Sequence, residues 1–301
     1  MLIQLQIDLE HSQLVDTLEA LKKAEPDSVS ASSDSSKVHI QGIRASYDEV
    51  RPHLSTNSTI FDQNARKCLL WLGSSLGNFT RQEAADFLRQ YAEEGMKPGD
   101  TFLIGIDSTD DAALIETAYG DPAGVTEAFI LNGVDNASRI LSEATGKPND
   151  LAGNKFNYVH RYNVTEGCHE AYIQAKEDLN IDAGSRGTFT IKKDELLAIE
   201  RSYKFSATDS QYLLDHAKLR SVQKWSDPTG AYNLHLVEKP KFYFPSTYQA
   251  TTNPFGLPTL EDWEQIWAAF DTATLDMVPE HLLHTKPIDL RHICLFYIGH
   301  M

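Results

Sequence analysis

Cysteine and basic residues are both scarce in this sequence of 301 residues. The three cysteines, Cys68, Cys168 and Cys294, are odd in number and far apart, so they form neither a disulfide framework nor a Cys-x-x-Cys metal knuckle. Cysteines without a disulfide pattern indicate that the protein works in a reducing compartment. The sequence has 27 Lys and Arg residues but 43 Asp and Glu residues, which gives a net charge of −16. Nucleic acids and anionic membranes require clustered basic side chains, which are missing here, so we expect neither as a partner. A small zwitterionic substrate is compatible with this charge.

Long apolar runs and a basic leader are also missing. No run approaches the roughly 18 apolar residues of a membrane span, and residues 1–8 alternate like a strand rather than a signal peptide. The composition, 41% hydrophobic and 23% charged, is that of a packed globular protein. We therefore predict a cytoplasmic protein.

The first half of the chain alternates between strand-like and helix-like segments. The predicted strands are 2–8, 38–43, 67–73 and 101–107, and the predicted helices between them include 10–24 and 81–92. The run 67–73 is apolar enough to be buried on both faces, as in a parallel sheet. This succession of βαβ units predicts a doubly wound α/β domain.

The second half follows a different pattern. Helical spacing over about 123–145 gives way to antiparallel strands within 158–175 and 187–205, which we interpret as an inserted substrate lobe. A helix is expected over 208–219 and a closing strand over 232–237. The predicted division is listed from the N-terminus: an α/β core (1–145), a substrate lobe (146–206), a return to the core (207–240), a linker (241–258) and a helical segment (259–301), with helices at 259–277 and 286–300.

The run Leu72–Phe79 is the strongest local signal for a binding site. It follows a buried strand, and ligands of open α/β sheets bind beyond the carboxyl ends of the strands. Gly73 and Gly77 allow close approach of a ligand to the backbone, and the Asn78 amide can donate to a carboxylate. The structural alternative is a tight turn that an Asx side chain caps before the next helix.

A second signal lies in 198–205, where Glu200, Ser202 and Lys204 share one strand face. A carboxylate beside a hydroxyl could hold an imidazole, one accepting from and the other donating to its two nitrogens. The alternative is a solvated strand face with a Glu–Lys pair.

Two further residues have both a functional and a structural interpretation. Tyr119, just before Asp121 and Pro122, could point into a pocket, although a helix start capped by Asp121 explains this run equally well. Asp8 ends the first strand, where an acidic residue often holds a cofactor ribose, and a surface aspartate is the alternative.

In combination, these segments resemble the histidine-specific methyltransferase family over about residues 1–240. The resemblance rests on the following runs, in chain order: 72–79, 119–129, Glu170 within 169–172, 200–205 and 225–227. It implies a Rossmann-like class I methyltransferase that uses S-adenosylmethionine to trimethylate the α-amino group of histidine, giving hercynine, in ergothioneine biosynthesis.

The resemblance also implies roles for individual residues. Asn78 and Tyr119 would bind the amino-carboxylate end of histidine, and Glu200 with Ser202 the imidazole. The residues implied for the cofactor are Asp8, Ser46 and Tyr47 beside the ribose and adenine, and Gly73 and Ser74 beside its methionine part. Methyl transfer from a sulfonium depends chiefly on alignment, so no obligatory general base is expected. Tyr119 is the catalytic candidate, because it could orient the amine or relay its proton.

Residues 253–301 resemble the linker and first helices of a DinB-like domain, which follows the methyltransferase in fungal ergothioneine enzymes. His300 stands where the first iron-binding histidine of that domain is expected. A lone histidine cannot complete a multi-ligand iron site, so no metal is expected in this chain.

One part of the family pattern has no counterpart here: a first strand and glycine-rich loop upstream of residues 2–8. We therefore expect an N-terminally incomplete core, in which two half-sheets face each other with unpaired edges, and impaired activity. Two alternatives remain open. One is an indole-alkaloid (dimethylallyltryptophan-type) N-methyltransferase, and the other is a catalytically silent fragment or pseudoenzyme.

Overall fold

The computed structural model describes residues 2–24, 38–55, 64–243 and 260–300. The elements of the α/β core, in chain order, are β1 (Leu2–Asp8), α1 (His11–Ala24), β2 (Val38–Arg44), α2 (Tyr47–Leu54), β3 (Cys68–Trp71), a 3₁₀ helix (Ser75–Asn78), α3 (Arg81–Gln90), β4 (Thr101–Asp107), α4 (Ala112–Tyr119), α6 (Ala207–His216), β10 (Arg220–Ser226) and β11 (Tyr232–Glu238). The predicted α/β class is confirmed.

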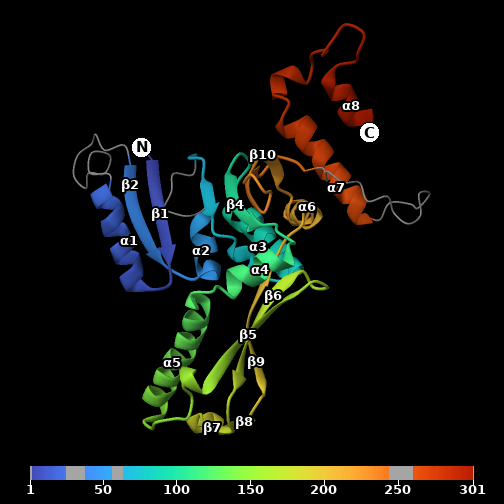
Figure 1. The fold of residues 1–301 in the computed structure, drawn as a ribbon. Coiled ribbons are helices and arrows are strands. Elements are labelled where there is room, and N and C mark those ends of the chain that lie inside the picture. The colour runs from blue at the N-terminus through green and yellow to red at the C-terminus, as the bar shows by residue number, and fades with distance from the viewer. Residues whose placement is uncertain (1, 25–37, 56–63, 244–259, 301) are drawn as a thin grey trace.

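The strands of this core form two separate sheets within the described ranges. β1 pairs in parallel with β2, whereas the second sheet has the order β10-β11-β4-β3. β3 is parallel to β4, and β11 runs antiparallel between β4 and β10. Figure 1 shows the β1–β2 unit with α1 standing apart from the sheet that contains β4. The expected half-sheets are therefore present, and β1 does not pair with β3.

The main hydrophobic core lies between the second sheet and the helices that cover it. Phe102 and Ile104 of β4 are fully buried there, together with Leu88 of α3 and Leu213 of α6. Phe102 and Ile104 lie two positions apart and so point to the same face of β4, whereas Leu103 between them is only half-buried.

β3 corrects one prediction. We expected its run to be buried on both faces, but Leu70 is 63% exposed and Leu72, directly after the strand, is 52% exposed. Only Leu69 and Trp71 turn toward the core. β3 is an edge strand with one uncovered face, so its apolar composition did not imply burial on both sides.

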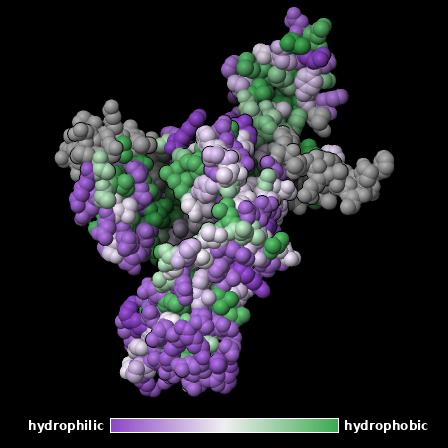
Figure 2. Space-filling model, viewed as in Figure 1, coloured by the Kyte–Doolittle hydropathy of each residue, from purple (hydrophilic) through white to green (hydrophobic). Residues whose placement is uncertain are grey.

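A second lobe projects from the core (Figure 1). Its elements are α5 (Val125–Thr145), β5 (Phe156–Asn163), β6 (Cys168–Ala175), β7 (Leu179–Asp182), β8 (Thr188–Ile191) and β9 (Leu196–Tyr203). β5, β6 and β9 form an antiparallel sheet with β6 in the middle. Ile130 and Val134 of α5 pack with Phe156 and Ile173 of this sheet. Figure 2 shows that the outer surface near β7 and β8 is predominantly hydrophilic.

The C-terminal segment contains α7 (Leu260–Asp271) and α8 (Cys294–His300). The predicted helix over 286–300 is wrong in its first half, because residues 286–293 form turns and bends. Pro287 and the turn-forming residues that follow it explain this difference. Most of the linker assigned to 241–258 lies outside the described residues.

Candidate active site

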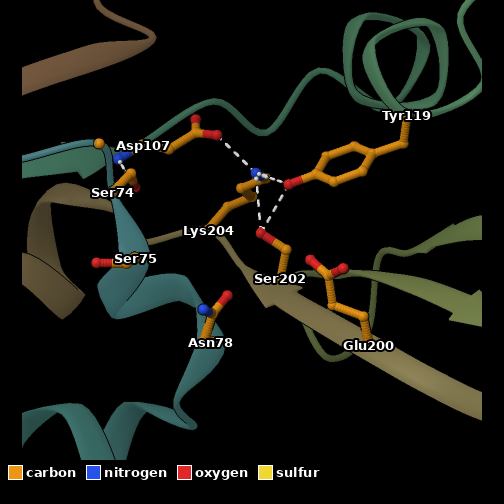
Figure 3. Close-up of a pocket in the computed structure, with 9 residues that line it drawn as sticks. Ser74, Ser75, Asn78, Asp107, Tyr119, Glu200, Ser202 and Lys204 are labelled. Atoms are coloured by element: carbon orange, nitrogen blue, oxygen red, sulfur yellow. Dashed lines mark hydrogen bonds and ion pairs between the residues drawn. The ribbon is translucent and has the colours of Figure 1, made fainter. Parts of the chain in front are cut away.

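A polar pocket lies where the lobe meets the carboxyl ends of β3 and β4. It has a volume of about 270 Å³, and its lining residues are Gly73, Ser74, Ser75, Asn78, Asp107, Tyr119, Glu200, Ser202 and Lys204. Figure 3 shows that these side chains converge from the 3₁₀ helix, the end of α4 and β9. The volume lies just below the usual range of about 300–1,000 Å³ for ligand pockets. A cavity of this size suits a small amino acid.

The turn after β3 forms one wall of the pocket. Gly73 and Ser74 have φ angles of +79° and +59°, so the chain reverses sharply before the 3₁₀ helix. The Ser74 hydroxyl accepts the backbone N–H of Asp107 at 2.7 Å, which ties this turn to the end of β4. A Cβ atom at Gly73 would meet nothing within 4 Å, so the backbone there is open to a ligand.

Gly77 brings this wall against β9. A Cβ atom at Gly77 would lie 2.8 Å from the carbonyl oxygen of Tyr203 and 3.3 Å from Oγ of Ser202, so only glycine permits this approach.

Asn78 does not have the capping role of the structural alternative. The N-cap of α3 is Thr80, whose hydroxyl accepts the backbone N–H of Glu83 in a complete capping box. The exposed Asn78 amide therefore remains available to the pocket.

The opposite wall comes from β9. Because side chains alternate along a strand, Glu200 and Ser202 face the same cavity. Lys204, just after the strand, shares this face but is only 6% exposed. Its ammonium group pairs with Asp107 at 2.6 Å, so the alternative of a solvated Glu–Lys pair is wrong.

Tyr119 connects the two walls. Its hydroxyl donates to Oγ of Ser202 at 2.7 Å and accepts from Nζ of Lys204 at 3.1 Å. Its ring stacks on the imidazole of His169, with ring centroids 3.8 Å apart and planes 12° from parallel. Asp121 meanwhile accepts the backbone N–H groups of Val125 and Thr126 at the start of α5. Tyr119 therefore lines the pocket while Asp121 binds the start of α5, and a substrate-binding role for Tyr119 remains a prediction.

The two titratable groups that contact Tyr119, His169 and Lys204, both have shifted pKa values. Burial, reinforced by the nearby His160 and Lys204, lowers the pKa of His169 to about 4, and neither of its ring nitrogens has a hydrogen-bond partner among the described residues. Burial also opposes the charge of Lys204, but its hydrogen bonds to Asp107 and Tyr119 outweigh this and raise its pKa. At neutral pH the site therefore holds a neutral imidazole and a charged ammonium group.

Three residues implied for cofactor binding lie outside this pocket. Asp8 ends β1 and accepts the backbone N–H of Glu10. Ser46 caps α2 by accepting the backbone N–H of Glu49. Tyr47 is 51% exposed, and its ring centroid lies 4.5 Å from that of Trp71. All three lie at the carboxyl ends of β1 and β2 or directly after them, so a cofactor role for them remains a prediction.

Sequence reasoning did not assign Ser75, Asp107 or Lys204 to the site, although they line the pocket, nor His169, which stacks on Tyr119. The signals for two of them were present. Asp107 ends a buried strand, where sheet ligands bind, and Lys204 continues the face of Glu200 and Ser202. His169 had no local signal, because its burial beneath Tyr119 depends on contacts between distant segments.

No group of three or more His, Cys, Asp or Glu side chains within the described ranges is arranged to hold a metal ion. His300 is the last residue of α8. None of the helices that the structure describes is both long and apolar enough to cross a membrane.

Comparison with known proteins places this site in context. The chain is 37% identical to ergothioneine biosynthesis protein 1 of Neurospora crassa over 269 residues, which cover 88% of this chain and 28% of that protein. It is 31% identical to the histidine N-alpha-methyltransferase of Mycobacterium tuberculosis, covering 68% of this chain and 60% of that one. The chain thus spans less than two thirds of either relative.

A methyltransferase structure from Clostridium acetobutylicum, described as S-adenosylmethionine-dependent, aligns with 12% identity and a TM-score of 0.37, covering 78% of this chain and 74% of that one. The model of the family described as histidine-specific methyltransferase, SAM-dependent, matches residues 4–239. This match includes every residue that lines the pocket. The chain therefore belongs to the histidine-specific, S-adenosylmethionine-dependent methyltransferase family.

Proposed function

We propose that this chain carries the amino-acid site of an enzyme that methylates the α-amino group of histidine, giving hercynine for ergothioneine biosynthesis in the cytosol. The observation that carries the proposal is the pairing of a carboxylate and a hydroxyl, Glu200 and Ser202, on one face of β9 inside an amino-acid-sized pocket. An imidazole presents one N–H and one lone pair, which such a pair can satisfy together.

The other end of the substrate would lie toward the 3₁₀ helix and α4. The Asn78 amide can donate to the substrate carboxylate. The Tyr119 oxygen accepts from Lys204 and retains a second lone pair, which can accept an N–H from the substrate amine. Held in this way, the amine would be oriented for attack.

The residues near Gly73 suit a methyl donor. The backbone is open at Gly73, and Ser74 lies beside it in the pocket wall. The described cavity is too small for both substrates, so the adenosine part would extend beyond it, toward Asp8, Ser46 and Tyr47. S-adenosylmethionine supplies an electrophilic methyl group on a sulfonium.

The protein's part in the reaction is alignment. In each transfer a C–N bond forms as the C–S bond breaks, and the amine must first have lost a proton. The Tyr119 oxygen is positioned to hold the amine lone pair in line or to pass its proton toward solvent. Well-aligned reactants reach very large effective molarities, so positioning can provide most of the acceleration.

Calorimetric titration with histidine and with S-adenosylhomocysteine, separately and together, tests the binding part of this proposal. Mass spectrometry of histidine incubated with protein and S-adenosylmethionine tests the reaction. We expect mono-, di- and trimethylated histidine, with tryptophan unmethylated under the same conditions. Methylated tryptophan without methylated histidine would refute the proposal in favour of an indole substrate.

A further inference from the structure

Lys204 is a buried cation whose three N–H donors are all engaged. Its Nζ atom contacts Oδ2 of Asp107 at 2.6 Å, the Tyr119 hydroxyl at 3.1 Å and Oγ of Ser202 at 3.4 Å. An ammonium group has three donors and no acceptor. In both hydroxyl contacts, therefore, the oxygen of Tyr119 or Ser202 must accept.

The hydroxyl proton of Tyr119 is also committed. It points to Oγ of Ser202, at 2.7 Å, which is the favoured direction because a phenol is more acidic than an aliphatic alcohol and is the better donor. The Ser202 oxygen thus accepts from both Tyr119 and Lys204. These contacts use its two lone pairs and leave only its own proton, for a ligand in the pocket.

Glu200 supplies a hydrogen-bond acceptor beside the donor Ser202. Its carboxylate lines the same pocket and has no hydrogen-bond partner among the described residues, so it offers acceptors only. The pocket therefore presents one donor, Ser202, and one acceptor, Glu200. A neutral imidazole matches this pair, an imidazolium has no lone pair for Ser202, and an indole ring has an N–H but no acceptor nitrogen.

We propose that Lys204, held by Asp107, is a positioning residue that fixes Ser202 as a hydrogen-bond donor and thereby makes the site select the neutral imidazole form of histidine. This inference rests on the proposed function, but it needs only one part of it, namely that histidine binds in this pocket.

Other titratable groups surround Ser202. The titratable groups that face the Ser202 region come from five elements and from Lys204 itself: Asp107 on β4, Tyr119 on α4, Tyr158 and His160 on β5, His169 on β6, and Glu200 on β9. Burial lowers the pKa of His169 to about 4 and raises that of Tyr158 to about 12, so both are neutral near pH 7. The Lys204 ammonium is paired with Asp107 at 2.6 Å, and the Glu200 carboxylate faces the same pocket, so the selection depends on the hydrogen-bond geometry at Ser202 and not on net charge.

The test is the pH dependence of histidine binding, measured by calorimetry in the presence of saturating S-adenosylhomocysteine between about pH 5 and 8. If only the neutral imidazole binds, affinity should fall about tenfold for each pH unit below about 6.5. In Lys204→Met the Ser202 oxygen regains a lone pair and the cation is gone, so an imidazolium can bind. We expect its affinity to fall less than about threefold per pH unit over the same range.

Matched variants isolate this effect. Lys147→Met removes a lysine that pairs with Asp182 on the lobe surface, and it should keep the wild-type pH dependence. If Lys204→Met fails to fold, the double variant Lys204→Met/Asp107→Asn removes both charges and should show the same weakened dependence.

A measurement on the wild-type protein needs no variant at all. Nitrogen-15 NMR of bound labelled histidine at about pH 6 should show one protonated and one unprotonated ring nitrogen. Two protonated ring nitrogens would overturn the inference, and so would equal pH dependence in wild type and Lys204→Met. Absence of histidine binding by the wild type at every pH would instead overturn the proposed function, and the inference with it.

Discussion

Removal of the Glu200 side chain tests the imidazole site most directly. Glu200 faces the pocket from β9, and its carboxylate makes no hydrogen bond to another described residue. In Glu200→Ala the fold should therefore lose no internal hydrogen bond, and the free energy of unfolding should change by less than about 0.5 kcal/mol. A bound imidazole, by contrast, would lose its charged partner.

The size of the loss follows from the type of hydrogen bond. A hydrogen bond to a charged group contributes about 1.5–3 kcal/mol, and each 1.4 kcal/mol is about tenfold in the dissociation constant. Glu200 is partly exposed to solvent, which weakens the interaction and favours the lower end of this range. We expect histidine affinity to fall about 10- to 30-fold, with the affinity for S-adenosylhomocysteine changed less than about twofold.

Calorimetry on wild type, Glu200→Ala and a control variant measures both affinities. Glu127→Ala is the control, because Glu127 is an exposed carboxylate in the first turn of α5, outside the pocket. Unchanged histidine affinity in Glu200→Ala would refute the imidazole role of this carboxylate. An equal loss for both ligands would mean that the substitution disturbs the pocket as a whole.

Three further predictions concern stability. The pKa of His169 is about 4 in the folded state and about 6.5 in the unfolded state, so the unfolded state takes up a proton first as the pH falls. The free energy of unfolding should therefore decrease by up to about 3 kcal/mol between pH 6.5 and pH 4. Urea titrations should show a smaller decrease in His169→Phe, and an equal decrease in that variant would contradict this prediction. Thr80→Ala should lower the free energy of unfolding by about 1 kcal/mol through loss of the α3 cap, whereas Thr117→Ala on the exposed side of α4 should change it by less than about 0.5 kcal/mol. Hydrogen exchange should be at least about tenfold slower in β4, paired on both sides, than in β1, paired with β2 alone, and comparable protection would indicate that β1 gains a second partner in solution.

Much of the architecture was predictable because hydrophobic periodicity is a local property. The strands at 2–8 and 101–107 have the predicted bounds, and the antiparallel lobe lies where β-branched residues and alternation indicated it. Other elements were less visible. β10 was not predicted, since all seven of its residues are exposed and carry no burial pattern. Burial of the strand before Gly73 was overestimated, because composition does not reveal which sheet face a helix covers.

The sequence by itself determined the α/β class, the family and six residues of the pocket: Gly73, Ser74, Asn78, Tyr119, Glu200 and Ser202. The glycine turn after a strand and the polar residues two apart on one strand face are short-range patterns, whereas the family and the role of Ser74 came from the resemblance. Only the tertiary structure decided that Lys204 pairs with Asp107, 97 positions earlier, and that His169 lies beneath Tyr119. Such contacts depend on how the lobe packs against the sheet. Burial and charge pairing are properties of that packing, and no local stretch of sequence specifies them.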